Sequence, residues 1–250
     1  MRTFFIGLAA MSAALTMAVA PAQAVPATPC DSALASTTVG PLVVPAGATC
    51  TLTDVVVDGN IRIMAGGALL THGSTLQGNV MGNGARTVQL INTDVVGNGT
   101  TGNIDLSGTQ ESIIIGSDGC AVDPATGNNI NLFGNDGPIA ICYMTVGESI
   151  NLKNNHDRIG VFHNTIGNPL IVQNNDAPFV RLRDNEVGVT GGGSMIVQNN
   201  ITTGNAKSTN GLRIKRNYSH NRLNCVGNVA APIGKGNTAD NGMSGQCVGL

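Results

Sequence analysis

Apolar and polar residues alternate in short segments that recur along the chain about every 20 residues. Copies of the first segment begin at Ile130, Ile150, Leu170 and Met195. A second segment begins at Ile139, Ile159, Val180 and Leu212. A third, shorter segment ends in Val-Gly or Ile-Gly at residues 146–147, 166–167 and 187–188. Alternation with a period of two predicts three short strands in each repeat, each with one buried face.

One such repeat cannot bury its own apolar face, whereas stacked repeats bury a continuous core. The pattern therefore predicts an all-β fold, a right-handed parallel β-helix with three short strands in each coil of about 20 residues. The residues expected to point inward are Ile150, Leu152, Ile159, Val161 and Ile166. A left-handed β-helix has a hexapeptide rhythm of about 18 residues in each coil, which fits these spacings less well.

Asparagines end many of the segments and fall in two aligned series. Asn155, Asn175 and Asn200 belong to the first series. The second series holds Asn164, Asn185 and Asn217. Asparagine tolerates the backbone geometry of a corner, and its amide can bond the same amide in the next coil. We therefore expect amide ladders along two corners of the solenoid.

The first residues have the pattern of an export signal. Arg2 is followed by an apolar stretch from Phe4 to Ala20, and residues 22–24 form a small-x-small cleavage site. We predict a signal peptide over residues 1–24 and a single β-helix domain over residues 25–250. No other apolar run is long enough to span a bilayer, so the expected location is secreted or extracellular.

Six cysteines in an exported chain favour disulfides. Sequential pairing at one repeat length would join Cys30 to Cys50, Cys120 to Cys142 and Cys225 to Cys247. The first and last pairs would then staple the two end caps of the domain. The register places Cys120 near a third strand and Cys142 on a second strand, so the connectivity of that pair stays open. No Cys-x-x-Cys motif and no histidine spacing indicates a metal, and no cofactor is expected.

Two terminal motifs carry a resemblance to known proteins. The first runs from Leu42 through Val-Val-Pro-Ala-Gly-Ala-Thr to Cys50. The second is Asn224-Cys-Val-Gly-Asn followed by Gly245-Gln-Cys. With the Gly-Asn coils between them, the chain resembles a group of secreted actinobacterial β-helix repeat proteins of unknown function. The resemblance covers most of the chain after the signal peptide and implies the fold and export, but no activity.

Charge is distributed unevenly along the sequence. Residues 25–152 hold ten acidic residues and two arginines, whereas residues 153–222 hold nine basic and four acidic residues. In the repeat register Arg181 stacks on Arg213, Arg183 stacks on Lys215, and Asp184 stacks on Arg216. Like charges in neighbouring coils repel unless solvent or an anion lies between them.

The leading hypothesis is a non-catalytic binding strip for an acidic polysaccharide or another anionic polymer of the cell envelope. Its expected binding residues are Lys153, Arg181, Arg183, Arg213, Lys215 and Arg216. An ordinary solvated face is the alternative, because exposed charges often contribute little. Nucleic acid is not an expected partner, since the chain has no tryptophan and two tyrosines for base stacking.

The alternative function is a polysaccharide lyase acting on uronates at the same strip, by analogy with enzymes that share this fold. Arg183 and Lys215 would neutralise the uronate carboxylate, and His163, Tyr218 or Lys215 would remove the α-proton. A glycoside hydrolase would need two facing carboxyl groups. Only Asp184 and Glu186 are close in this segment, and a corner is expected to separate them.

Overall fold

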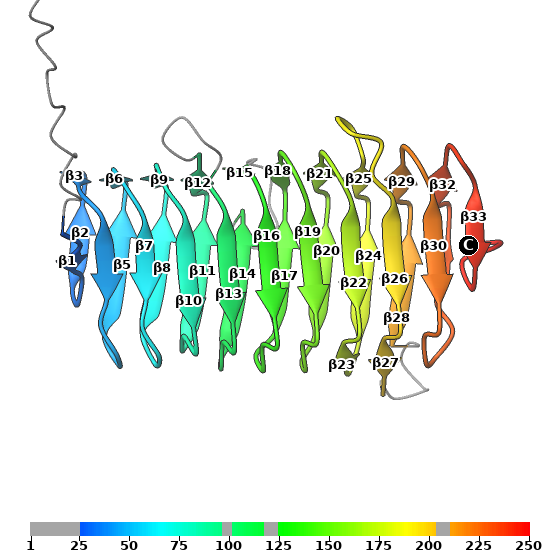
Figure 1. The fold of residues 1–250 in the computed structure, drawn as a ribbon, viewed down its shortest axis with the longest axis horizontal. Coiled ribbons are helices and arrows are strands. Elements are labelled where there is room, and N and C mark those ends of the chain that lie inside the picture. The colour runs from blue at the N-terminus through cyan, green and yellow to red at the C-terminus, as the bar shows by residue number, and fades with distance from the viewer. Residues whose placement is uncertain (1–25, 97–101, 118–124, 204–210) are drawn as a thin grey trace, which may run out of the picture.

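The computed structural model describes residues 26–96, 102–117, 125–203 and 211–250, which wind as a stack of similar coils (Figure 1). The paired strands in these ranges are parallel, and no helix occurs among the described residues. The protein is a right-handed parallel β-helix, as the repeat predicts. The predicted signal peptide, residues 1–24, lies outside the described residues.

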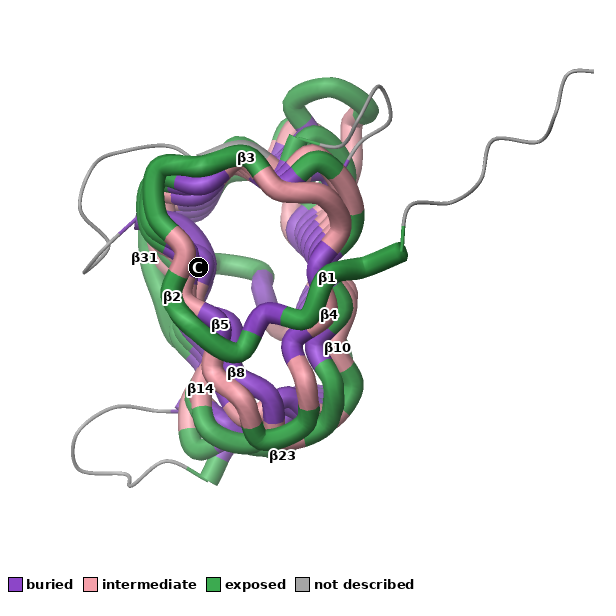
Figure 2. The backbone as a smooth tube through the Cα atoms, turned by 90° about the vertical axis from the view of Figure 1, so that its left-hand side faces the viewer, coloured by how far each residue is buried: buried purple, intermediate pink, exposed green. Residues whose placement is uncertain are grey.

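Sheet A has 11 strands and forms one side of the coils, where Figure 2 shows β1, β4 and β10. Its strands are β1 (Thr28–Pro29), β4 (Leu42–Val44), β7 (Ile61–Ile63), β10 (Val80–Asn83), β13 (Ile104–Ser107), β16 (Ile130–Phe133), β19 (Ile150–Lys153), β22 (Leu170–Gln173), β26 (Met195–Gln198), β30 (Leu223–Val226) and β33 (Met243–Gly245).

Sheet B has ten strands and lies across the core from sheet A, on the side of β2, β5 and β31 in Figure 2. Its strands are β2 (Ala33–Ala35), β5 (Thr49–Thr53), β8 (Ala68–His72), β11 (Thr87–Ile91), β14 (Ser112–Gly116), β17 (Ile139–Cys142), β20 (Ile159–Phe162), β24 (Val180–Arg183), β28 (Leu212–Lys215) and β31 (Ile233–Lys235).

Shorter strands form the remaining side and one corner. Sheet C contains β3 (Thr38–Val39), β6 (Val56–Val57), β9 (Thr75–Leu76) and β12 (Asp94–Val95). Sheet D contains β15 (Ala125–Gly127), β18 (Met144–Val146), β21 (Thr165–Ile166), β25 (Glu186–Val187), β29 (Tyr218–Ser219) and β32 (Thr238–Ala239). At the corner between sheets A and B, β23 (Asp176–Ala177) pairs with β27 (Ile201–Thr202).

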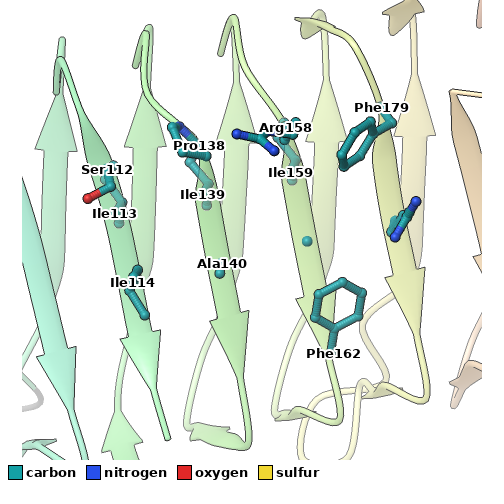
Figure 3. Close-up of a pocket in the computed structure, with 12 residues that line it drawn as sticks. Ser112, Ile113, Ile114, Pro138, Ile139, Ala140, Arg158, Ile159, Phe162 and Phe179 are labelled. Atoms are coloured by element: carbon teal, nitrogen blue, oxygen red, sulfur yellow. The ribbon is translucent and has the colours of Figure 1, made fainter. Parts of the chain in front are cut away.

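The coils lie in the register that the repeat predicts. Ile150 pairs with Leu170, and Leu170 pairs with Met195, in one column of sheet A. All three side chains are fully buried. A matching column of isoleucines in sheet B starts at Ile113 and continues at residues 139 and 159 (Figure 3). Residues about 20 positions apart in sequence are therefore neighbours in space. The side chains exposed on each side of the solenoid come from such columns.

Buried asparagine ladders run along two corners, as the sequence predicts. In the first ladder, Asn155 Nδ2 donates to Asn175 Oδ1 over 3.0 Å, and Asn175 Nδ2 donates to Asn200 Oδ1 over 2.8 Å. In the second ladder, the amide of Asn164 donates to Asn185 Oδ1 over 2.9 Å. Each Oδ1 also accepts the backbone N–H of the preceding asparagine, which satisfies polar groups that the core would otherwise leave without partners.

Two of the predicted disulfides are present. Cys30 is bonded to Cys50, with 5.2 Å between their Cα atoms, and joins the first coil to the second. Cys225 is bonded to Cys247, with 5.1 Å between their Cα atoms, and staples the C-terminal end. The third predicted pair includes Cys120, which lies outside the described residues.

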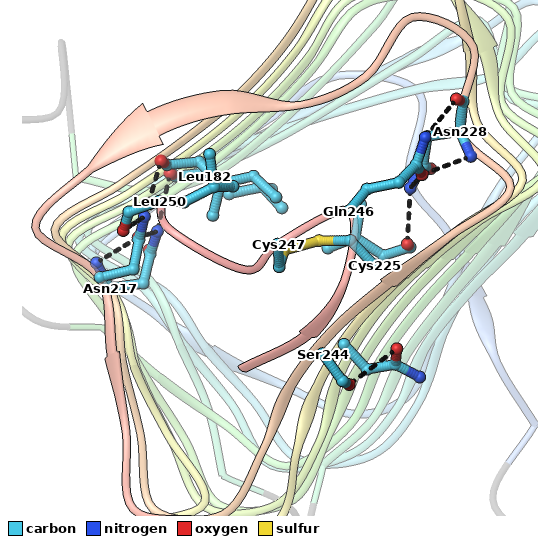
Figure 4. The surroundings of a disulfide bond; sticks show 12 residues. Leu182, Asn217, Cys225, Asn228, Ser244, Gln246, Cys247 and Leu250 are labelled. Atoms are coloured by element: carbon cyan, nitrogen blue, oxygen red, sulfur yellow. Dashed lines mark hydrogen bonds between the residues drawn. A yellow bond between two sulfur atoms is a disulfide. The ribbon is translucent and has the colours of Figure 1, made fainter. Parts of the chain in front are cut away.

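The last residues of the chain close the C-terminal end of the solenoid (Figure 4). Gln246 Oε1 accepts the side-chain amide of Asn228 over 3.1 Å, where the first asparagine ladder ends. The carbonyl of Leu250 accepts the side-chain amide of Asn237 over 3.1 Å, where the second ladder ends. Leu250 also packs against the hydrophobic core, so the tail provides both hydrogen-bond partners and apolar cover for the final coil.

Candidate functional site

The outward face of sheet B carries two columns of basic side chains in the late coils. Arg181 of β24 pairs with Arg213 of β28, and Arg183 pairs with Lys215. Leu182, between the two arginines of β24, is fully buried. Because successive strand residues point to opposite sides, the basic residues all project away from the core. The structure therefore brings these four predicted residues together on one face.

Lys235 extends one of these columns, although it was not predicted as a site residue from the sequence. It lies on β31, where it pairs with Lys215 and is exposed. Its spacing of one repeat from Lys215 is the signal that could have found it. That strand has Gly234 at the position of the inward Ile214, so its apolar alternation is too weak to indicate a strand.

Four of these cations have no acidic partner within the described ranges. The ion pairs there involve other basic side chains and leave out Arg181, Arg213, Lys215 and Lys235. Neighbouring coils are about 4.8 Å apart, and two like charges near that distance repel by about 1 kcal/mol even in water. An anion bound between the cations would remove this repulsion.

The same side chains surround a depression in the sheet B face. Its volume is about 360 Å³. The residues that line it are Phe162, Arg181, Leu182, Arg183, Arg213 and Lys215. The face is therefore concave between the two basic columns, which allows one bound group to contact cations from two coils.

One carboxylate, Asp184, lies at the edge of this face and organises the adjoining corner. Asp184 accepts two hydrogen bonds from Arg216, at 2.6 Å from Nε and 2.7 Å from Nη2. It also lies 3.1 Å from Nε of Arg183 and 3.5 Å from Nε2 of His163. The hydrogen bonds from Arg216 hold the pKa of Asp184 below its ordinary value, and the positive charges around it act in the same direction.

In the late coils this corner places different residue types at positive φ from those at the corner after sheet A. At the corner after sheet A, the residues with positive φ are glycine or asparagine, at positions 47, 66, 84, 108, 134, 154, 174, 199 and 227. At the corner after sheet B, four successive coils instead place Tyr143, His163, Asp184 and Arg216 at φ between 52° and 56°. Left-handed geometry costs a side chain with a Cβ roughly 1–2 kcal/mol. Large polar side chains are thus held in one line despite that cost.

His163 is fixed within this line by contacts on two sides. Its ring stacks on Tyr143, with 4.7 Å between the ring centroids and 8° between the planes. Its Nε2 lies 3.3 Å from a guanidinium nitrogen of Arg183. The same nitrogen lies 3.5 Å from Oδ2 of Asp184, so the ring is held between Tyr143, Arg183 and Asp184.

Two predicted site residues do not reach this face. Lys153 lies on β19 in sheet A, across the coil from sheet B. Tyr218 lies on β29 in sheet D, because the buried Asn217 turns the chain between β28 and β29. The hydroxyl of Tyr218 donates to Asp240 over 2.7 Å, which raises the pKa of Tyr218. The phenol stays protonated and is unsuited to act as a base on the sheet B face.

The two carboxylates considered for a hydrolase also point to different surroundings. Asp184 contacts Arg216 at the corner, whereas Glu186 on β25 lies 2.9 Å from Nε2 of His220. The corner at Asn185 separates them, as the sequence predicts. Among the described residues, no group of three or more His, Cys, Asp or Glu side chains has a geometry that could hold a metal ion.

Comparisons with family models, with curated proteins and with solved structures find no match to this chain. Within the described ranges no helix is long and apolar enough to cross a membrane. The candidate site is a concave basic face on sheet B, bordered by the corner at Asp184.

Proposed function

We propose that this protein is a secreted, non-catalytic solenoid that binds an anionic extracellular or cell-envelope polymer along the outward face of sheet B. The observation that supports this most strongly is the in-register stacking of Arg183, Lys215 and Lys235 beside Arg181 and Arg213. Cations repeat there once in each coil, at about 4.8 Å. A polymer with regularly spaced anionic groups meets one or two cations at every coil.

Export is supported by two independent features. The N-terminal sequence has the pattern of a signal peptide. The Cys30–Cys50 and Cys225–Cys247 disulfides are typical of proteins that fold in an oxidising compartment. Both fit a protein that meets envelope polymers outside the cell.

The test is charge reversal at the centre of the face, with Arg183→Glu and Lys215→Glu combined. Binding to polygalacturonate and to inorganic polyphosphate is measured at low salt by titration calorimetry. We expect the affinity for both polymers to fall at least about tenfold, equivalent to 1.4 kcal/mol. The affinity of the unaltered protein should also fall as salt rises, because ions screen exposed charges. Unchanged binding by the double variant would contradict the proposal.

A matched control separates a local face from overall charge. The combination of Lys153→Glu and Arg222→Glu makes the same change in net charge away from sheet B, and we expect it to retain most of the affinity. Asp184→Asn works in the opposite direction, since it removes the carboxylate that contacts Arg183 and Arg216. That variant should bind both polymers more tightly than the unaltered protein.

A second candidate function is a uronate lyase on the same face, favoured by the contact between His163 Nε2 and Arg183. Arg183 would neutralise the uronate carboxylate while His163 takes the α-proton. The electron pair of that C–H bond forms a C=C bond, the glycosidic C–O bond breaks, and the leaving oxygen takes up a proton from solvent.

Ultraviolet absorbance of the unsaturated product tests this candidate across a panel of acidic polysaccharides. Product that disappears in His163→Ala but persists in His156→Ala, an exposed histidine elsewhere, would support a lyase. The absence of product over the whole panel would count against it and leave the binding proposal standing.

A further inference from the structure

A second depression, lined mainly by apolar groups, adjoins the basic one on the sheet B face (Figure 3). Its volume is about 390 Å³. The residues that line it include Ile114, Ala140, Phe162 and Phe179, together with Arg158 and Arg181. Phe162 and Arg181 line both depressions, so the two form one continuous surface along the solenoid axis.

Small outward residues open the floor of this depression. Ala140 of β17 pairs with Gly160 of β20, and Gly160 pairs with Arg181 of β24. A Cβ atom on Gly160 would lie 2.4 Å from Cε2 of Phe162. The Phe162 ring therefore folds over its own strand and occupies the space that a larger side chain at residue 160 would take.

Both aromatic rings are in contact with guanidinium groups. The ring centroid of Phe179 lies 4.7 Å from Cζ of Arg181 and 5.9 Å from Cζ of Arg158. The ring centroid of Phe162 lies 5.6 Å from Cζ of Arg183. Aromatic rings and positive charges thus lie next to one another on one surface. Such a surface suits a ligand that has both apolar faces and negative charges.

We infer that the polymer is an acidic polysaccharide whose sugar rings pack against Phe162 and Phe179 while its anionic groups meet the neighbouring arginines and Lys215. This inference rests on the proposed function and names its ligand class. A sugar ring presents C–H groups on its faces, which complement the negative face of an aromatic ring. A polyphosphate carries the charge but no ring, and would leave the apolar depression uncovered.

The experiment compares Phe162→Ala against the unaltered protein on two polymers, polygalacturonate and inorganic polyphosphate. We expect affinity for polygalacturonate to fall about fivefold, the scale of one aromatic contact, while affinity for polyphosphate stays within about twofold. Gly160→Ala displaces the Phe162 ring without removing it. This variant should also bind polygalacturonate more weakly than the unaltered protein. Phe133→Ala removes an exposed phenylalanine from sheet A and should leave both affinities unchanged.

The outcomes distinguish this inference from the proposed function. Equal losses for both polymers, or no loss for either, would overturn the assignment to polysaccharides. Binding of an anionic polymer would still stand if charge reversal at Arg183 and Lys215 weakens it. Thermal melting checks that each variant folds, and Phe179→Leu replaces Phe162→Ala if that variant does not. No loss of polygalacturonate affinity in a folded Phe179→Leu variant would equally overturn the inference.

Discussion

Asp184 shows how one residue controls the electrostatics of the candidate face. It pairs with Arg216 and Arg183, and the hydrogen bonds from Arg216 keep its pKa below the ordinary value. A carboxyl whose pKa is lower in the folded state stabilises the fold above its unfolded pKa, near pH 4. That contribution is lost as the pH falls through the folded pKa. The same carboxylate offsets part of the positive charge offered to a ligand.

Asp184→Asn tests this effect on stability. We expect a loss of about 1 kcal/mol in the free energy of unfolding at pH 7, because the ion pairs remain in contact with water. The difference between the variant and the unaltered protein should shrink as the pH falls from 5 to 2. Urea denaturation at several pH values measures both quantities. A difference that does not depend on pH would show that the Asp184 carboxylate does not stabilise the fold through its charge.

At the scale of structural elements, the asparagine ladders connect one coil to the next inside the corners. Asn185 is 2% exposed and bonds to Asn164, to Asn217 and to the carbonyl of Val161. Removing such a side chain leaves buried donors without acceptors, which costs more than a hydrogen bond contributes when it forms. A corner asparagine in this solenoid therefore has a structural role and is a poor candidate for ligand binding.

Asn185→Ala should lower the free energy of unfolding by about 3 kcal/mol. The matched control is Asn151→Ala, which removes an outward asparagine of sheet A that donates to Asn131 over 2.8 Å at the surface. We expect the control to cost less than about 1 kcal/mol, since water replaces the lost partner. Denaturant titration of both variants compares them, and equal losses would contradict the role assigned to the buried ladder.

At the scale of the whole molecule, the solenoid must protect its two ends. In a stack of repeats each coil contacts mainly its neighbours, so stability depends on nearest-neighbour interfaces and unfolding can start at an end. The Cys225–Cys247 disulfide, Gln246 and Leu250 secure the C-terminal coil. At the other end, Cys30–Cys50 joins the first two coils.

Replacement of Cys225 and Cys247 by alanine should destabilise the C-terminal coils first, by about 3 kcal/mol for a loop of this length. Native-state hydrogen exchange should then show faster exchange over residues 211–250 while residues 42–96 stay protected. The corresponding double variant at Cys30 and Cys50 should give the opposite pattern. Uniform loss of protection in both variants would show that the solenoid unfolds as one cooperative unit.

The earliest coils were harder to recognise from the sequence than the later ones. Leu42, Ile61 and Val80 pair in register at intervals of 19 residues. The corners of these coils hold glycine at residues 66 and 84 in place of doubled asparagine, so the most visible mark of the repeat is missing. The apolar alternation is still present there and is sufficient to form the strands.

The coil length, the register and the two basic columns could all be predicted from the spacing of residues along the chain. Alternation with a period of two shows which side chains of a strand share a face. The repeat shows which residues stack in neighbouring coils, so the stacking of Arg183 on Lys215 could be predicted from spacing. Which of these columns share a surface depends on how the folded chain turns at each corner. Corners redirect the chain by angles that alternation does not encode. For that reason Tyr218 and Lys153 lie away from the face, while Phe162, Phe179 and Lys235 lie on it.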